Sequence, residues 1–291
     1  MNLKLSKNEL IALEKLCNND FSIGQLAEEL KKKESYVSRL VKMLEGKGLA
    51  YRVENRKIAL SPASHAQSFK KLYLSRPEAR VEEWLSGHAI GILIILASPQ
   101  EGVPIDLFWK ETPCSKPTTY SILKRLMGAG ALVKNEKIRI SDKAVEEFAN
   151  YYADNIQRIA TSKIQGMKTS IRVRLRVVAR ARVKEAPTEF VQTGISALAG
   201  HGLEAMQTKD SYFCINLSGK QEKIGIEEAF IHGLLMATLE QGQDKQVLAL
   251  FLMKNRGRMN VAKLRALARQ YSVESDLATM RDALDYVEKA V

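Results

Sequence analysis

The chain has 291 residues, of which 45% are hydrophobic and 27% are charged. This composition is ordinary for a folded protein of two or three domains, and it excludes a disordered polypeptide. No apolar run reaches the roughly 20 residues that a membrane-spanning helix needs, so we expect no membrane association.

The cysteines Cys17, Cys114 and Cys214 lie far apart, without the paired spacings of zinc sites or disulfide frameworks. The first ten residues lack the apolar core of a signal peptide. We therefore expect a cytoplasmic protein with no cofactor and no metal.

The formal net charge of +12 is unevenly distributed. Residues 155–184 contain nine Lys and Arg and no Asp or Glu, whereas residues 185–291 contain 12 cations and 14 acidic residues. A positive charge concentrated in this way attracts polyanions such as nucleic acids.

Residues 22–60 predict a helix, a turn, a second helix and a β-hairpin. Ser22 can cap a helix that continues to Leu30, and residues 35–47 repeat apolar side chains at helical spacing up to Gly48. The short segments 49–53 and 57–60 are typical of two strands joined by a tight turn.

The polar face of the second helix and the hairpin tip supply the first candidate DNA contacts. Short hydroxyls, one aromatic ring and cations on one helix face can reach base edges and phosphates in a major groove. The candidates on the helix are Lys33, Ser35, Tyr36, Ser38, Arg39 and Lys42, and those on the hairpin are Arg52, Asn55, Arg56 and Lys57.

The stretch SYVSRLVKMLEGKGL, residues 35–49, resembles the recognition helix of MarR-like winged helix-turn-helix regulators of archaea and bacteria. The resemblance covers about sixty residues and implies duplex DNA as the partner. Residues 6–17 predict the additional helix that such a domain has before the motif, and residues from Ser61 to Tyr73 predict a connecting helix after it.

A second copy of the pattern follows at an offset of 82 residues, which places Gly48 on Gly130 and Leu40 on Ile122. The sequence thus predicts a tandem winged helix, with helices at 88–98 and 105–110 and a third helix capped by Ser115. Nearly balanced charge leaves open that this copy is a packing or dimerising module. Its candidate DNA contacts are Lys116, Thr118, Thr119, Lys124, Arg125 and Lys137.

Residues 142–162 predict a long helix with Val145, Phe148, Ala149 and Tyr152 on one side. Long helices of this kind commonly link or dimerise winged-helix proteins. We therefore expect a homodimer.

Residues 171–184 alternate apolar and cationic side chains, which is typical of a long strand or hairpin with one buried and one cationic face. The cationic face could be solvated or protect a sheet edge. Cations at every other position repel one another, however, and this favours an anionic partner. The candidate contacts are Arg172, Arg174, Arg176, Arg180 and Arg182.

The region after Pro187 predicts a strand-to-helix turn, a strand at 212–217 and about four helices, at 226–239, 244–255, 260–271 and 275–289. The segments TGISAL (193–198) and IEEAFIHGLL (226–235) resemble the carboxy-terminal domain of abortive-infection-type antitoxin regulators and of nucleotidyltransferase-like archaeal proteins. This resemblance implies a possible toxin or other protein partner for the domain.

A working nucleotidyltransferase needs a Gly-Ser turn followed by paired carboxylates that hold divalent metal. Gly194 and Ser196 supply the turn, but Asp210 stands alone before the next strand. We therefore expect a degenerate domain without catalytic residues. Glu227, Glu228 and His232 share a helix face at metal-ligand spacing, although His232 is better explained as a buried structural residue.

The sequence thus predicts a mainly α protein with small β-wings and a C-terminal α+β domain. The expected domains are residues 1–76, 77–162 and 163–291. The leading hypothesis is a DNA-binding transcriptional regulator. The alternatives are a nucleotidyltransferase-like toxin or RNA-modifying enzyme, and a non-regulatory DNA-binding protein such as a plasmid replication initiator or chromosome-organising factor.

Overall fold

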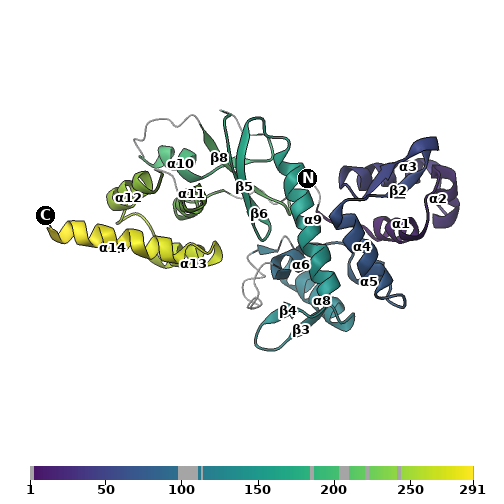
Figure 1. Cartoon of the computed structure of the whole chain (residues 1–291). Coiled ribbons are helices and arrows are strands. Elements are labelled where there is room, and N and C mark those ends of the chain that lie inside the picture. Colours follow the sequence, from purple (N-terminus) through teal and green to yellow (C-terminus); the bar gives the residue numbers. More distant parts are fainter. Residues whose placement is uncertain are drawn as a thin grey trace. The chain divides into compact units, whose positions relative to one another are not determined.

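A computed structural model of the chain describes residues 3–97, 111–112, 114–183, 187–202, 210–219, 223–240 and 244–290. The protein is mostly helical, with small antiparallel sheets (Figure 1). It divides into two compact units, the first comprising residues 1–159 with 217–219 and the second residues 160–216 with 220–291. The expected domains 1–76 and 77–162 thus fall within the first unit, except for residues 160–162. None of the described helices is both long and apolar enough to span a membrane.

The first unit begins with three packed helices and a two-stranded hairpin. Its third helix is followed by strands that pair antiparallel from Ala50 opposite Leu60 to Arg52 opposite Ile58. Phe21, just before the second helix, forms an isolated bridge with Ile58 and so ties the hairpin to the helices. The elements are α1 (Lys7–Asn18), α2 (Ile23–Leu30), α3 (Glu34–Gly46), β1 (Ala50–Arg52), η1 (Glu54–Arg56) and β2 (Ile58–Leu60).

Local sequence signals set the ends of these helices. Ser6 and Ser22 each form a complete capping box, in which the serine hydroxyl accepts a hydrogen bond from the third helical N–H. After α3, Gly48 has φ +68°, a left-handed conformation that glycine adopts without steric cost. The predicted helix limits therefore agree with the observed ones to within one or two residues.

The predicted internal repeat is confirmed for one helix and its hairpin. Strand pairing in the second copy runs from Leu132 opposite Ile140 to Lys134 opposite Ile138, and Gly130 has φ +67°. The predicted helix at 105–110 lies outside the described residues. The second copy contains α6 (Ala89–Ala97), α8 (Lys116–Gly128), β3 (Leu132–Lys134) and β4 (Ile138–Ile140).

Three further helices complete the first unit: α4 (Ser64–Leu74), α5 (Val81–Trp84) and the long α9 (Lys143–Thr161). The apolar face of α9 is buried within this unit. Phe148 packs edge-on against Phe69 at 5.5 Å between ring centroids, and the hydroxyl of Tyr152 donates to the carbonyl of Leu3. The apolar face of α9 is therefore already covered by the chain itself.

The second unit contains a four-stranded antiparallel sheet in the order β5-β6-β8-β7. The strands are β5 (Met167–Val173), β6 (Arg176–Ala181), β7 (Val191–Gln192) and β8 (Ser211–Asn216). The predicted basic segment is thus a hairpin, with Arg174 and Leu175 between its two strands and Val173 opposite Arg176.

The prediction of one cationic face on this hairpin is wrong. Because residues directly opposite each other share a face, the two-residue turn places Arg176 beside Val173 and Arg172 beside Val177, on opposite faces. Val178 lies on the same face as Arg176 and is fully buried. The alternation in the sequence therefore does not place the arginines on a single surface.

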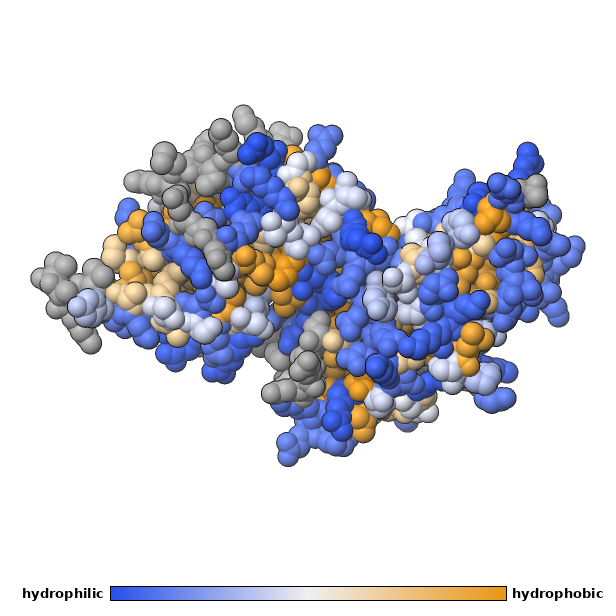
Figure 2. Space-filling view, viewed as in Figure 1, coloured by the Kyte–Doolittle hydropathy of each residue, from blue (hydrophilic) through white to orange (hydrophobic). Residues whose placement is uncertain are grey.

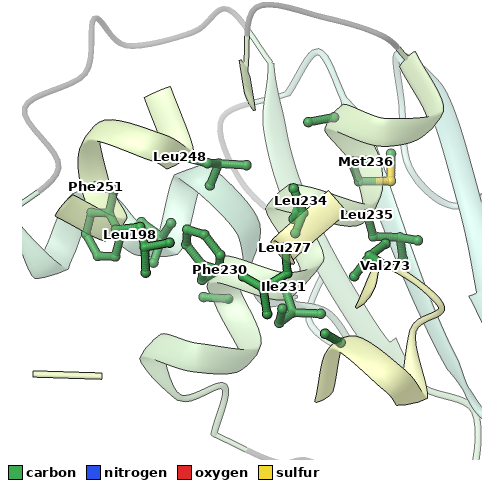
Figure 3. Close-up of a cluster of buried hydrophobic side chains, with 14 of the residues drawn as sticks. Leu198, Phe230, Ile231, Leu234, Leu235, Met236, Leu248, Phe251, Val273 and Leu277 are labelled. Carbon is green, nitrogen blue, oxygen red and sulfur yellow. The ribbon is translucent and has the colours of Figure 1, made fainter. Parts of the chain in front are cut away.

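One face of the sheet packs against the helices of this unit, and together they form its core. Val178, Tyr212 and Cys214 of the sheet join Phe230 and Leu234 of the helices. Figure 3 shows side chains of this core from several helices packed together. The helices are α10 (Gly194–Leu198), α11 (Ile226–Glu240), α12 (Asp244–Lys254), α13 (Val261–Gln270) and α14 (Glu274–Ala290), with η2 (Ala199–His201) after α10.

Candidate nucleic-acid interface

Helix α3 separates its side chains cleanly between core and surface. Val37, Leu40, Val41 and Leu44 are buried, which turns the opposite face outward. Most of the candidate contacts lie on this outward face: Lys33, Ser35, Arg39 and Lys42 are exposed, while Tyr36 and Ser38 are half-buried.

Two of the α3 candidates have local partners. The hydroxyl of Tyr36 accepts a hydrogen bond from Asn8 Nδ2 at 2.5 Å, so this ring is held against α1. Arg39 Nε donates to the carbonyl of Ser35 at 3.4 Å within the same helix. Neither Arg39 nor Lys42 forms an ion pair with a carboxylate in the described part of the chain, so both cations are available to a ligand.

The β1–β2 hairpin carries the other cations of this surface. Arg56 and Lys57 are exposed, and Arg56 has φ +59° at the tip of the turn. Arg52 is exposed as well, but it pairs with Glu45 at 3.0 Å. The side chain of Asn55 lies outside the described part of the chain. The hairpin thus adds two exposed cations beyond the end of α3.

The second copy has a less suitable surface. Thr119 was expected to face a groove, and this is wrong: the residue is fully buried, and its hydroxyl lies 3.2 Å from Thr112 Oγ1 and 3.1 Å from Cys114 Sγ. Arg125 donates to the carbonyl of Ser86 at 2.9 Å, so it holds α8 to the preceding segment. The remaining candidates, Lys116, Thr118, Lys124 and Lys137, are exposed.

The arginines of strand β6 pair with carboxylates of the same unit. Arg176 forms an ion pair with Glu228 of α11, and Arg180 pairs with Glu240 and with Asp210. These carboxylates lie 30 to 60 residues further along the chain, so the charge imbalance of residues 155–184 is largely compensated in space. Arg176 and Arg180 thus hold the sheet to its helices, which corrects the expectation that they face nucleic acid.

Asp210 pairs with other cations besides Arg180. It also accepts from Lys168 at 2.6 Å and lies 3.7 Å from Arg182. Burial opposes ionisation of this carboxyl, but its hydrogen bonds from Lys168 and Arg180 outweigh burial and lower its pKa. Arg182 is itself largely exposed, whereas Arg172 and Arg174 are half-buried at the hairpin end.

The Gly-Ser turn of the second unit is used for packing. Gly194 has φ +54°, and a Cβ there would lie 3.0 Å from Tyr212. The hydroxyl of Ser196 accepts from the Tyr212 N–H at 3.0 Å. Both residues of the turn that a nucleotidyltransferase would present to a phosphate are therefore in contact with the neighbouring strand.

His232 is a structural residue at the centre of the core. It is fully buried, with Nδ1 2.7 Å from Thr193 Oγ1 and Nε2 2.7 Å from the Tyr271 hydroxyl. Burial and then the charge of Arg176 lower its pKa to about 3, so the ring is neutral at physiological pH. Among the described residues, no group of three or more His, Cys, Asp or Glu side chains could hold a metal ion.

Sequence reasoning missed a second basic segment. Residues 254–273 contain six Lys and Arg and no Asp or Glu. The acidic residues on either side of the segment concealed it when charges were counted over residues 185–291. A twenty-residue window would have found it.

The chain was compared with protein-family models, with curated proteins and with solved structures, and none of the three comparisons found a match.

Proposed function

We propose that the protein binds duplex DNA through the outward face of α3 and the β1–β2 hairpin, as a winged helix-turn-helix transcriptional regulator does. The observation that carries the proposal is the division of α3 into a buried apolar face and an exposed face with Ser35, Arg39 and Lys42. An α-helix fits into the major groove, where hydroxyls and cations on its outward face can contact bases and phosphates.

The hairpin supports the same proposal. The hairpin packs against α3 through β1 and directly follows this helix in the chain, as the wing of a winged helix does. Its exposed cations Arg56 and Lys57 would then contact the DNA backbone beside the groove that α3 enters. The second copy repeats the helix and the hairpin, but its buried Thr119 and its occupied Arg125 leave fewer side chains for DNA. We therefore assign groove reading to the first copy.

The direct test is selection of bound DNA from a random pool, followed by binding measurements on the selected duplex. The double variant Arg39→Ala/Lys42→Ala should bind at least tenfold more weakly at about 150 mM salt. It should also lower the slope of log Kobs against log salt by about 1.8, because each lost phosphate contact removes about 0.9.

The matched control is Lys15→Ala/Lys71→Ala, which removes the same charge from the same unit. Both lysines are exposed and already paired, with Glu29 at 2.7 Å and Glu147 at 2.6 Å. An equal loss of binding in this control would mean that net charge alone matters, and it would contradict the assignment to α3. A pool without a consensus would favour the DNA-organising alternative.

The proposal includes a homodimer, formed through the second unit rather than through α9. A groove of about 410 Å³ between α12 and α14 is lined by apolar residues that include Ala249, Met280 and Leu284. Figure 2 shows hydrophobic side chains gathered over α12, where Leu250 is 55% and Met253 39% exposed.

A second copy of the chain suits this groove. A ridge and a groove that lie side by side on one helix can fill each other across a twofold axis. The groove is also lined by Lys245 and Asp276, which pair at 2.7 Å and could exchange partners between two copies.

A further inference from the structure

We propose that the basic segment 254–273, centred on α13, is a second contact surface for the nucleic-acid phosphate backbone. The inference rests on the proposed DNA binding and adds the second unit to it. It replaces the β5–β6 hairpin, whose strand β6 arginines are paired with carboxylates, as the cationic surface of this unit.

Three of the six cations of the segment have no carboxylate partner within the described residues. Lys254, Arg258 and Arg265 are exposed and have no ion pair within the described residues. Lys263 and Arg269 pair with Glu227 and Glu274, both at 2.9 Å, and Arg256 pairs with Asp285 of α14. The exposed cations Lys254, Arg258 and Arg265 lie at the end of α12, in the connection that follows it and on α13, respectively. A polyanion that binds there would be attracted by all three charges.

The arrangement of arginines indicates a phosphate rather than a larger ligand. Arg265 and Arg281, together with Arg256 that pairs with Asp285, line one small pocket that the buried Leu252 and Leu264 also line. Its volume of about 40 Å³ is far below the ~300 Å³ of small-molecule sites, so it would take a single anionic group. Guanidinium groups bind phosphate oxygens through paired hydrogen bonds.

The exposed face of α13 fits a nucleic acid better than a membrane surface. Each arginine of α13 follows an exposed alanine by three residues, Ala262 before Arg265 and Ala266 before Arg269, and these small side chains let the backbone approach a phosphate chain closely. Among the described residues of α13, Val261 is the one large apolar side chain that is strongly exposed. A membrane-binding helix would need a continuous apolar face.

The test uses the full chain and a duplex unrelated to any selected sequence. Arg258→Ala/Arg265→Ala should lower the salt slope by about 1.8 and weaken binding roughly tenfold at about 150 mM salt. The matched control is Lys163→Ala/Lys168→Ala, which removes two cations of the same unit that pair with Glu189 and Asp210. This control should keep the slope of the unmodified protein.

Equal slopes for the two double variants would overturn the inference. So would loss of binding to vesicles of anionic lipid with unchanged binding to DNA. Failure of the proposed function has a different signature, because it would leave the protein without sequence preference while Arg258 and Arg265 still govern non-specific binding. Circular dichroism on each variant shows whether a loss of binding reflects loss of folding.

Discussion

At the scale of single residues, Glu14 of α1 and Glu82 of α5 form a pair of neighbouring carboxyl groups. Burial, and then the negative charge of Glu82, raise the pKa of Glu14 from 4.5 to about 7. Because the folded state binds this proton more tightly, its contribution to stability is complete below about pH 4.5 and is lost as the pH rises through 7.

The variant Glu14→Gln should therefore gain stability relative to the unmodified protein as the pH rises from 4.5 to 7.5. One unit of pKa corresponds to about 1.4 kcal/mol, and screening at this half-buried position reduces the total to about 1–2 kcal/mol. Urea unfolding at several pH values measures the difference. Glu83→Gln, on the exposed side of α5, is the control and should show no such gain; a flat difference for Glu14→Gln would refute the pairing.

At the scale of elements, the two copies of the helix and hairpin provide a matched pair of glycines. Gly48 and Gly130 have almost the same left-handed φ, +68° and +67°. A Cβ at Gly48 would lie 3.2 Å from His65 Nε2 and 3.3 Å from Asn155 Nδ2, whereas a Cβ at Gly130 would meet nothing within 4 Å. The same local turn therefore has crowded surroundings in one copy and open space in the other.

Substitution by alanine should separate the backbone cost of a left-handed residue from the cost of displacing its neighbours. Gly130→Ala should cost about 1 kcal/mol of unfolding free energy, the backbone cost of a left-handed alanine. Gly48→Ala should cost about 2–3 kcal/mol, because buried His65 and Asn155 must also move. Urea unfolding of the full chain measures both values, and equal costs would mean that the neighbours of Gly48 yield without strain.

At the scale of the whole molecule, the oligomeric state is the main prediction. Leu250→Glu places a charge on the apolar ridge beside the α12–α14 groove and should convert a dimer into a monomer, as measured by light scattering during gel filtration. Leu74→Glu is the control, since Leu74 lies on α4 in the first unit and is equally exposed at 55%. A monomeric unmodified protein, or a dimer that persists in Leu250→Glu, would exclude this interface.

The organisation into two units also affects how nucleic acid would be held. The proposed contacts lie on α3 and its hairpin in the first unit, and on α13 in the second. Binding through both units to one duplex would add their salt dependences. Combining Arg39→Ala/Lys42→Ala with Arg258→Ala/Arg265→Ala should therefore lower the salt slope by about the sum of the two separate changes.

The sequence by itself determined the local structure of this protein. Ser6 and Ser22 began their helices, and the four C-terminal helices ended within a few residues of the predicted limits, because caps and apolar periodicity act over one or two turns. The sequence repeat that aligns Gly48 with Gly130 is also a structural repeat, since each copy contains the same short-range hydrogen bonds after its helix.

Only the tertiary structure decided which polar side chains remain on the surface. A two-residue turn put Arg172 and Arg176 on opposite faces of a sheet, and carboxylates from α11 and the start of β8 then neutralised the arginines of β6. The apolar face of α9 was buried by segments far away in the chain, such as Phe69 of α4. Charge compensation and burial depend on long-range contacts, which no window along the sequence contains.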